Sequence, residues 1–368
     1  MCLTEGFKMK IAVVSSNEEK NGVGIYARKL FLELKKSNKD INFESILPNE
    51  SPLYYYLRGK SVAKKNYNLI NVQFDYPLFG KLGVSGVYAP LFYLGLGLKI
   101  PIISTFHDFT IFKGPTSLIF NTARKAINKF VYLYSDRVVV PDSYSKNNLV
   151  RMGVSKEKLE EIPLGAFFTR TEVKNAKKIL QLRGKKIISI FGFVSKHKDY
   201  KTVFKTLKSL GKKYHLIIAG GSMNKDNTFI DELKTEINNE KLENQVTITG
   251  FIQEKDFPTY LSATDICILP YKSMVASSAV LNQLMSFEKI VITTKLPSLV
   301  EIENDYNCIK TYKDEQELKN IIINISKHNK NLKKGINKYK KEFAFQAICK
   351  RYNNLFSKTI ENNLKKRN

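Results

Sequence analysis

The sequence predicts an α/β fold of two doubly wound domains, each with a parallel sheet between layers of helices. The first reason is length, because 368 residues, 43% of them hydrophobic, exceed what one ordinary core accommodates. The second is periodicity: short apolar runs rich in β-branched residues alternate with segments whose apolar residues recur at helical spacing. This alternation is typical of βαβ units and of parallel sheets.

The first domain is expected over residues 1–168. Its strands are expected at 10–15, 41–47, 69–73, 101–106 and 136–141, and its helices at 24–36, 120–134 and 145–152. The hydrophobic segment 87–103 is interrupted by Pro90, Lys99 and Pro101 and is too short to span a bilayer. It predicts a buried helix followed by a strand, with a helix lying on a membrane surface as the alternative.

A polar, basic stretch at 169–186 is interpreted as the connection to a second domain over 169–340. Strands are expected there at 187–191, 215–219, 246–249, 266–269 and 291–294, and helices at 200–210, 229–238, 257–262, 281–287 and 316–327. The tail, 337–366, is expected to be a long basic helical stretch with apolar side chains available for burial.

Charge and cysteine content restrict the class of protein. The net charge of +26 indicates an anionic partner or, with equal weight, a compositional bias toward Lys, Asn and Ile. Cys2, Cys267, Cys308 and Cys349 form no CxxC pair, so neither a zinc site nor a disulfide framework is expected and a reducing compartment fits. The polar N-terminus does not resemble an export signal, and we expect a cytoplasmic protein.

The stretch 262–303 carries the strongest motif. Two β-branched runs, 266–269 and 290–293, flank a small-residue loop at 276–279 and a segment with apolar residues at helical spacing. The free N–H groups at the start of that helix would face outward from the carboxyl end of a parallel strand. Such a place binds phosphate.

This run is similar to the donor-binding signature of the retaining nucleotide-sugar glycosyltransferases of family 4, which have the GT-B fold. The resemblance implies two Rossmann-like domains facing a cleft, with a C-terminal helix over 341–368 that packs back on the first domain. It also implies donor contacts from Ser277, Ser278, Ala279, Val280 and Leu281. The family usually has two glutamates flanking the loop. Val275 and Gln283 stand in their places, and only Gln283 keeps a polar group for the donor ribose.

Gly22 and Gly24 lie in a GxGxxA pattern that also occurs in dinucleotide-binding proteins. A nicotinamide cofactor is a weak alternative, because residues 17–21 separate the pattern from the strand and Glu44 lies within a predicted strand. The resemblance implies a glycine-rich loop that approaches the donor phosphates and the acceptor. The structural alternative is a tight turn that needs positive φ.

Two further segments follow strands of the first domain. Gln73, Asp75 and Tyr76 belong to a run that resembles the family's Q-x-E-x-x-x-F-G segment, and we expect them on the acceptor side. His107 ends the next strand and precedes an acid. This position favours a functional residue over a packed structural histidine, and the resemblance implies that His107 hydrogen-bonds the transferred sugar.

The second domain opens with a run, 191–200, that resembles the family's F-G-R-x-x-x-x-K-G segment around Gly192. Lys198 matches the lysine. Phe193 occupies the place of the arginine, so that contact is either lost or taken over by Lys196. A fixed cation stabilises the charge that grows on a leaving diphosphate without a metal; the alternative for Lys198 is a solvated surface lysine. Gly250 and Phe251 match a G-x-(I/V) turn whose backbone meets the nucleotide base in the family.

The resemblance therefore implies a metal-independent, retaining hexosyltransferase without a cofactor, acting in polysaccharide or glycolipid synthesis on a glycan or lipid-linked acceptor. The missing glutamates support the alternative of a non-catalytic GT-B binding protein, and a sugar-nucleotide epimerase is less favoured. No nucleic-acid partner is expected. Attachment to the inner face of an anionic membrane is a hypothesis based on basic and aromatic residues of the first domain: Tyr54, Tyr55, Tyr56, Arg58, Lys60, Lys64, Lys65, Arg124, Lys125 and Lys129.

Overall fold

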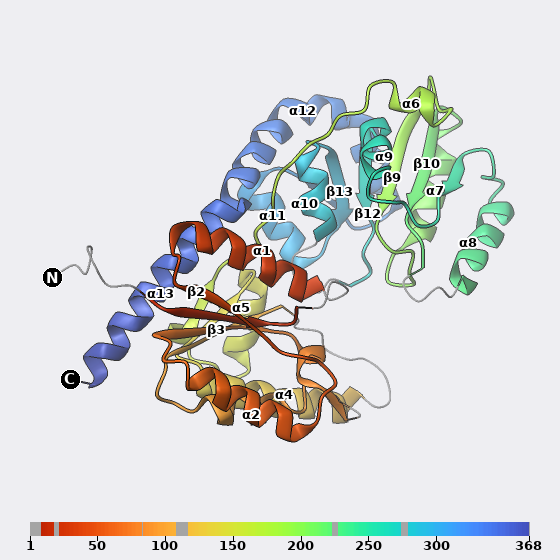
Figure 1. Ribbon diagram of the computed structural model, residues 1–368. Helices are drawn as coiled ribbons and strands as arrows, with labels where there is room; N and C mark the ends of the chain where they lie inside the picture. The colour runs from red at the N-terminus through yellow and green to blue at the C-terminus, as the bar shows by residue number, and fades with distance from the viewer. Residues whose placement is uncertain are drawn as a thin grey trace. The chain divides into compact units, whose positions relative to one another are not determined.

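The chain forms two compact units (Figure 1). The computed structural model describes residues 9–17, 22–82, 84–107, 117–222, 227–273 and 279–367. The first unit contains the chain up to Gly165 and the C-terminal segment from Phe345, and the second contains most of residues 166–344. The predicted domain limits were 168 and 340.

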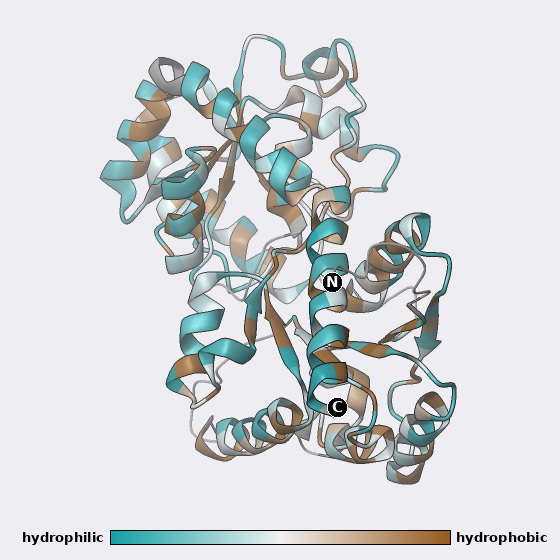
Figure 2. Ribbon diagram, turned by 90° about the vertical axis from the view of Figure 1, so that its left-hand side faces the viewer, coloured by the Kyte–Doolittle hydropathy of each residue, from teal (hydrophilic) through white to brown (hydrophobic). Residues whose placement is uncertain are grey.

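The first unit holds a six-stranded parallel sheet in the order β2-β1-β3-β6-β7-β8. Its strands are β1 (Ile11–Ser15), β2 (Ile41–Ser45), β3 (Leu69–Phe74), β6 (Ile102–Phe106), β7 (Arg137–Val140) and β8 (Leu159–Glu161). Both faces are buried, which explains the continuous apolar runs of the sequence and the brown strands in Figure 2.

Alternate residues of these strands enter two different cores. Ile70 and Val72 pack with α2 (Pro52–Ala63), α3 (Ala89–Leu96) and α4 (Ser117–Tyr134). Leu69 and Ile103 point to the other face and pack with α1 (Gly22–Ser37) and the C-terminal helix α13 (Phe345–Arg367). The remaining elements of this unit are α5 (Ser143–Arg151), the 3₁₀ turns η1 (Tyr76–Phe79) and η2 (Lys156–Lys158), and the short antiparallel pair β4 (Lys81–Leu82) and β5 (Val84–Ser85).

The second unit holds another six-stranded parallel sheet, in the order β11-β10-β9-β12-β13-β14. Its strands are β9 (Lys186–Phe191), β10 (Tyr214–Ala219), β11 (Val246–Ile248), β12 (Ile266–Leu269), β13 (Ile290–Thr294) and β14 (Lys310–Tyr312). Its helices are α6 (Ala176–Ile179), α7 (Tyr200–Leu210), α8 (Thr228–Asn239), α9 (Phe257–Ala263), α10 (Ala279–Ser286), α11 (Pro297–Tyr306) and α12 (Glu315–Phe343). One face packs on α7, α8 and the start of α12, and the other on α9, α10, α11 and the end of α12.

The prediction missed several elements. Helix α2 was not expected, although Ser51 caps it by accepting a hydrogen bond from the Tyr54 amide and Pro52 begins it. Helix α11 and the edge strands β8 and β14 were also missed. The tail is not one helical stretch from residue 337, because Ala344 has extended backbone and separates α12 from α13.

Two chemical features of the fold bear on the earlier predictions. Cys267, Cys308 and Cys349 are buried free thiols, and Cys2 lies outside the described residues. Across the described ranges, no helix is long and apolar enough to cross a membrane.

Candidate functional site

Each sheet has a place where the strand order reverses direction, and ligands of doubly wound sheets bind beyond the carboxyl ends of the strands at such a place. In the second unit this switch point lies between β9 and β12. Gly192 directly follows β9, and the segment from Pro270 directly follows β12. The predicted run 191–200 therefore begins at the switch point of its own sheet.

Lys198 is held at this switch point, between β9 and β12. The loop that carries it pairs with the segment after β12, through an antiparallel bridge between Lys198 and Tyr271 and a 2.7 Å hydrogen bond from the Asp199 amide to the Pro270 carbonyl. Asp199 also caps α7 by accepting from the Thr202 amide. These contacts hold the C-terminal end of the loop, and Lys198 with it, against the segment after β12.

The Lys198 ammonium group is buried, with only 5% of the residue exposed. Its Nζ donates to the carbonyl oxygens of Phe191 and Gly192, each at 2.9 Å. Burial lowers the pKa of Lys198 to about 8, because desolvation disfavours the charged form. The alternative of a solvated surface lysine is therefore wrong.

Gly192 lies between this lysine and the start of α10. Gly192 has φ +86°, and a side-chain Cβ there would lie 3.7 Å from Lys198 Nζ and 3.1 Å from Val280 Cγ2. Val280 is the second residue of α10, so the lysine and the first turn of that helix flank the same glycine. An ammonium group beside the positive end of a helix is a favourable place for an anion. We call Gly192, Lys198 and Val280 the lysine corner.

Glycines line the neighbouring strand ends. A Cβ on Gly220, which follows β10, would lie 2.4 Å from the Gly192 carbonyl oxygen, and Gly220 also pairs with Gly250 in an isolated bridge. Gly250 has φ +67°. Side chains are thus excluded from this edge, and a ligand can approach the backbone closely. Gly220 was missed, although a Gly-Gly pair directly after an apolar strand was a visible signal.

The other donor-side predictions have different environments. Ala279 begins α10, Leu281 is buried in the core, and Gln283 is exposed on the same helix. Val275, Ser277 and Ser278 lie outside the described residues.

Lys196 and Phe251 are both exposed. Lys196 forms an ion pair with Glu232 of α8 at 3.1 Å and lies over the Phe229 ring. Its side chain therefore contacts α8 in this structure. Phe251 is 79% exposed and borders a hollow of about 310 Å³.

In the first unit, His107 follows β6 and is partly exposed. Its Nε2 lies 2.9 Å from Gln73 Oε1, and its ring forms a T-shaped pair with the Tyr26 ring. Desolvation lowers the pKa of His107 to about 4, so the imidazole is neutral at pH 7. Gln73 is completely buried, and any influence it has on a ligand would pass through His107 rather than through direct contact.

The remaining predictions of the first unit separate into two kinds. Asp75 is partly exposed after β3 and stays an acceptor-side candidate. Tyr76 is buried, donates to Asn128 Oδ1 at 2.7 Å and lies beneath the Arg124 guanidinium. Its side chain therefore has structural contacts, and we no longer place it on the acceptor side.

The glycine pattern of α1 is helical. Gly22 and Gly24 lie in the first turn, and a Cβ on Gly24 would come within 2.8 Å of the Ser16 carbonyl oxygen. The expected alternative of a tight turn with positive φ is therefore wrong, because close approach of helix and strand explains Gly24. Glu44 is buried and bound by Arg58, Lys65 and Tyr67. Because these three side chains bind its carboxylate, Glu44 does not resemble an acid that binds the ribose of a nicotinamide cofactor.

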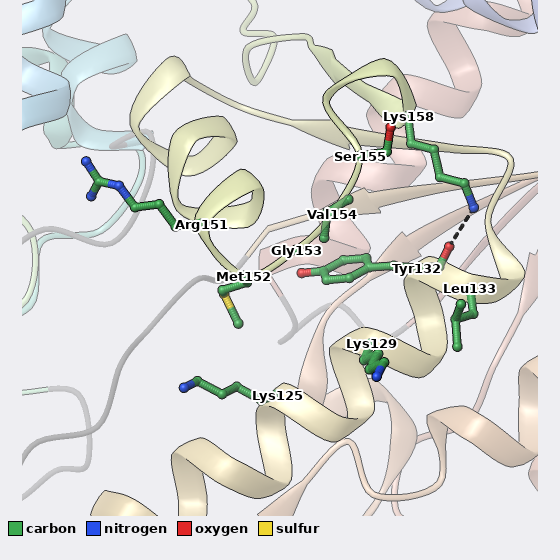
Figure 3. Close-up of a pocket in the computed structure, with 10 residues that line it drawn as sticks. All are labelled: Lys125, Lys129, Tyr132, Leu133, Arg151, Met152, Gly153, Val154, Ser155 and Lys158. Carbon is green, nitrogen blue, oxygen red and sulfur yellow. Dashed lines mark hydrogen bonds between the residues drawn. The ribbon is translucent and has the colours of Figure 1, made fainter.

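A second hollow, of about 700 Å³, lies in the first unit between α4 and the end of α5 (Figure 3). Tyr132, Leu133, Met152 and Val154 provide apolar walls. Basic side chains line it as well: Lys125, Lys129, Arg151 and Lys158. Lys158 Nζ donates to the carbonyl oxygens of Tyr132 and Ser135 at 3.2 and 2.9 Å. In the part of the chain that the structure describes, no three His, Cys, Asp or Glu side chains gather closely enough to hold a metal ion.

Comparisons with known proteins place these features in a family. Residues 52–166 match the profile described as Glycosyltransferase Family 4, and residues 172–343 match Glycosyl transferases group 1. The alpha-monoglucosyldiacylglycerol synthase of Streptococcus pneumoniae is 24% identical over 254 residues, which are 64% of this chain and 54% of that protein. The chain thus spans about half the length of this relative.

Solved structures share the fold over nearly the whole chain. HepE of Anabaena in complex with UDP superposes with a TM-score of 0.74 and 16% identity, over 95% of this chain and 100% of that one. Sucrose-phosphate synthase of Thermosynechococcus elongatus superposes with a TM-score of 0.73 and 16% identity, over 95% of this chain and 98% of that one. The predicted fold class is confirmed. Both matching profiles, which together span residues 52–166 and 172–343, describe glycosyltransferases, and the solved structures show that the chain has their GT-B fold.

Proposed function

We propose that the protein transfers a sugar, with retention of anomeric configuration, from a nucleotide diphosphate sugar to a glycan or lipid-linked acceptor. The lysine corner is the observation that carries the proposal. A buried ammonium group with a lowered pKa, beside a helix N-terminus and a side-chain-free strand edge, is suited to a diphosphate.

Lys198 would stabilise the leaving group. As the bond to the sugar breaks, negative charge grows on the diphosphate, and a preorganised cation stabilises that charge more than it stabilises the intact donor. The glycine edge at Gly220 and Gly250 would admit the nucleotide. We assign no step to a metal or a cofactor.

His107 is proposed to contact the transferred sugar. Its neutral imidazole at pH 7 suits hydrogen bonding to a hydroxyl group better than charge stabilisation. Asp75, partly exposed after β3, remains a candidate for the acceptor side.

Attachment to an anionic membrane surface is proposed on a smaller set of residues than the sequence indicated. Arg58 and Lys65 pair with buried Glu44, Arg124 lies over Tyr76, and Tyr55 is buried. What remains is the exposed side of α4, where Lys125 and Lys129 lie between exposed Leu118 and Leu133, and the exposed side of α2 with Leu53, Leu57, Lys60 and Lys64. Exposed leucines interspersed with lysines suit the boundary between headgroups and acyl chains.

Co-sedimentation with lipid vesicles tests the membrane proposal. Replacing Lys125 and Lys129 by Glu should weaken binding to anionic vesicles, because each cation near the surface contributes about 1 kcal/mol. The same change at exposed Lys201 and Lys205 of α7 is the control. Equal effects of both pairs, or no preference for anionic over neutral vesicles at low salt, would contradict the proposal.

Turnover of nucleotide sugars tests the enzymatic proposal. The protein is incubated with UDP-, GDP- and ADP-sugars, and release of the nucleoside diphosphate is followed without and with candidate acceptors. We expect hydrolysis or transfer with one donor, and a product anomer that matches the donor anomer by NMR. Binding without any turnover would instead support the non-catalytic alternative, which the residues at Val275 and Gln283 suggest.

A further inference from the structure

A buried chain of polar side chains leads from His107 into the first sheet. Gln73 and Asn71 are two residues apart on β3 and therefore point to the same face, as does Thr105 on the adjacent strand β6. All three are at most 2% exposed, on the sheet face where Leu69 and Ile103 are buried. A buried polar network of this kind is costly unless every member is paired, so its retention calls for an explanation.

The hydrogen bonds of this chain have one consistent direction. Asn71 Nδ2 donates to the backbone carbonyl of Ile103 at 3.2 Å, which leaves Asn71 Oδ1 to accept from Gln73 Nε2 at 2.5 Å. Gln73 Oε1 then faces His107 Nε2 at 2.9 Å. A carbonyl oxygen only accepts, so the Ile103 carbonyl determines the direction of both amides.

Rotating either amide would break this order. A rotated Gln73 would bring its oxygen against Asn71 Oδ1, and a rotated Asn71 would bring its oxygen against the Ile103 carbonyl. Gln73 Oε1 is an acceptor, and the nitrogen facing it must carry the proton. His107 is therefore held with hydrogen on Nε2, which leaves Nδ1 as a hydrogen-bond acceptor.

The C-terminal helix supports the chain from two sides. Thr105 Oγ1 accepts from Asn71 Nδ2 at 3.1 Å and from Gln73 Nε2 at 3.3 Å. With both lone pairs used, Thr105 gives its own proton to the Tyr352 hydroxyl oxygen of α13, 3.2 Å away. One face of α13 also presents Phe345, whose ring packs on Tyr26, and Tyr26 packs in turn on His107.

We propose that Asn71 is a positioning residue that fixes the His107 tautomer through Gln73, and that Tyr352 of the C-terminal helix supports this arrangement through Thr105. The consequence for specificity rests on the proposed function of His107. Because Nδ1 accepts, His107 recognises a substrate hydroxyl that donates its proton, and a substrate with only an acceptor at that position is disfavoured.

Nitrogen NMR of the histidine rings in the full-length protein, without substrate, tests the proposal. The chain has four histidines, and the His107→Ala variant identifies the signals of His107. In the wild type at pH 7, Nε2 should give the shift of a protonated nitrogen and Nδ1 that of an unprotonated one. In Asn71→Leu the Gln73 amide loses its acceptor on Asn71 and keeps Thr105, whose hydroxyl can also donate, so both signals should move toward intermediate positions. His215, which bonds Thr247 in the other unit, is the internal control and should not change.

A second, milder variant covers the case in which Asn71→Leu does not fold. Tyr352→Phe removes one oxygen, so the Thr105 proton turns back toward the amides, and the His107 signals should shift in the same direction by less. An Nδ1-protonated wild type, or unchanged His107 signals in a folded Asn71→Leu or Tyr352→Phe protein, would overturn the proposal.

Measurements of activity separate the proposed positioning role of Asn71 from the proposed function of His107. Loss of one neutral hydrogen bond predicts about a tenfold lower kcat in Asn71→Leu, whereas normal turnover of His107→Ala would contradict the proposed function and leave the tautomer result standing.

Discussion

Replacing Lys198 by methionine separates the expected contributions of this lysine to catalysis and to stability. Methionine has a similar length but no charge. A charge-assisted contact to the leaving diphosphate contributes roughly 2–4 kcal/mol in the transition state, so turnover should fall roughly 30- to 900-fold. This loss is expected only if the ammonium group meets the substrate.

Stability should respond differently. The pKa of Lys198 is about 8 in the folded protein and about 10.4 in an unfolded chain, so burying the charge costs about 3 kcal/mol of unfolding free energy at pH 7. Methionine removes this cost but leaves the Phe191 and Gly192 carbonyls without their donor, at about 1–3 kcal/mol each. The two effects offset one another, and we expect a net change of less than about 3 kcal/mol in either direction.

The pH dependence gives a second signature. Between pH 8 and 10.4 the unfolded lysine keeps its proton while the folded one releases it, so the wild type should gain stability relative to Lys198→Met as pH rises through this window. An anionic ligand restores the charge. Binding of a nucleoside diphosphate at pH 8–9 should therefore take up a proton, which calorimetry in buffers of different ionisation enthalpy detects.

Turnover of the best donor and urea unfolding at pH 7 and pH 10 are the two assays. Lys208→Met is the control, because Lys208 lies exposed on α7 and pairs with Glu240. An exposed ion pair contributes little to stability because water screens it, and turnover should not change. Normal turnover in Lys198→Met would refute the reasoning, and so would a loss of activity that merely follows the fraction of unfolded protein.

Two further substitutions examine other parts of the site. His107→Ala should lower turnover and leave nucleoside diphosphate affinity nearly unchanged, since the nucleotide is assigned to the second unit; an equal fall in both quantities would make His107 a structural or nucleotide-binding residue. Gly192→Ala should lower both stability and nucleotide affinity, because its φ of +86° disfavours a side chain and the new Cβ meets Val280. Gly211→Ala is its control, because Gly211 has φ +81° and a Cβ there would have no atom within 4 Å. This variant should lose a similar amount of stability but keep its nucleotide affinity. Equal nucleotide affinities of the two variants would contradict the assignment of Gly192 to the nucleotide site.

The central strands of both sheets were predictable from sequence because burial on both faces demands continuous apolar runs. The edge strands β8 and β14 were not. Each has three residues, includes charged side chains and pairs on one side only, so little of the apolar signal remains. The break at Ala344 was also hidden, since helix-forming residues continue on both sides of it.

The candidate site was predictable in its residue types but not in its contacts. The motif around Gly192 identified Lys198, yet its burial depends on pairing with the segment after β12, more than 70 positions along the chain. Gln73 was expected to face the acceptor substrate. It is instead a buried partner of His107, and this contact depends on the pairing of β3 with the adjacent strand β6. Tyr352 is separated from Thr105 by 247 positions, and no local pattern could connect them.

Calorimetric titration of a nucleoside, its monophosphate and its diphosphate tests the central claim, that the lysine corner holds the diphosphate of the donor. The base is chosen as the one whose diphosphate binds best among UDP, GDP and ADP. The account predicts that the diphosphate binds more tightly than the monophosphate by roughly 10- to 150-fold, the value of a charge-assisted hydrogen bond, and that Lys198→Met removes most of this difference. Equal affinities of the monophosphate and diphosphate, or a difference that survives in Lys198→Met, would contradict the claim.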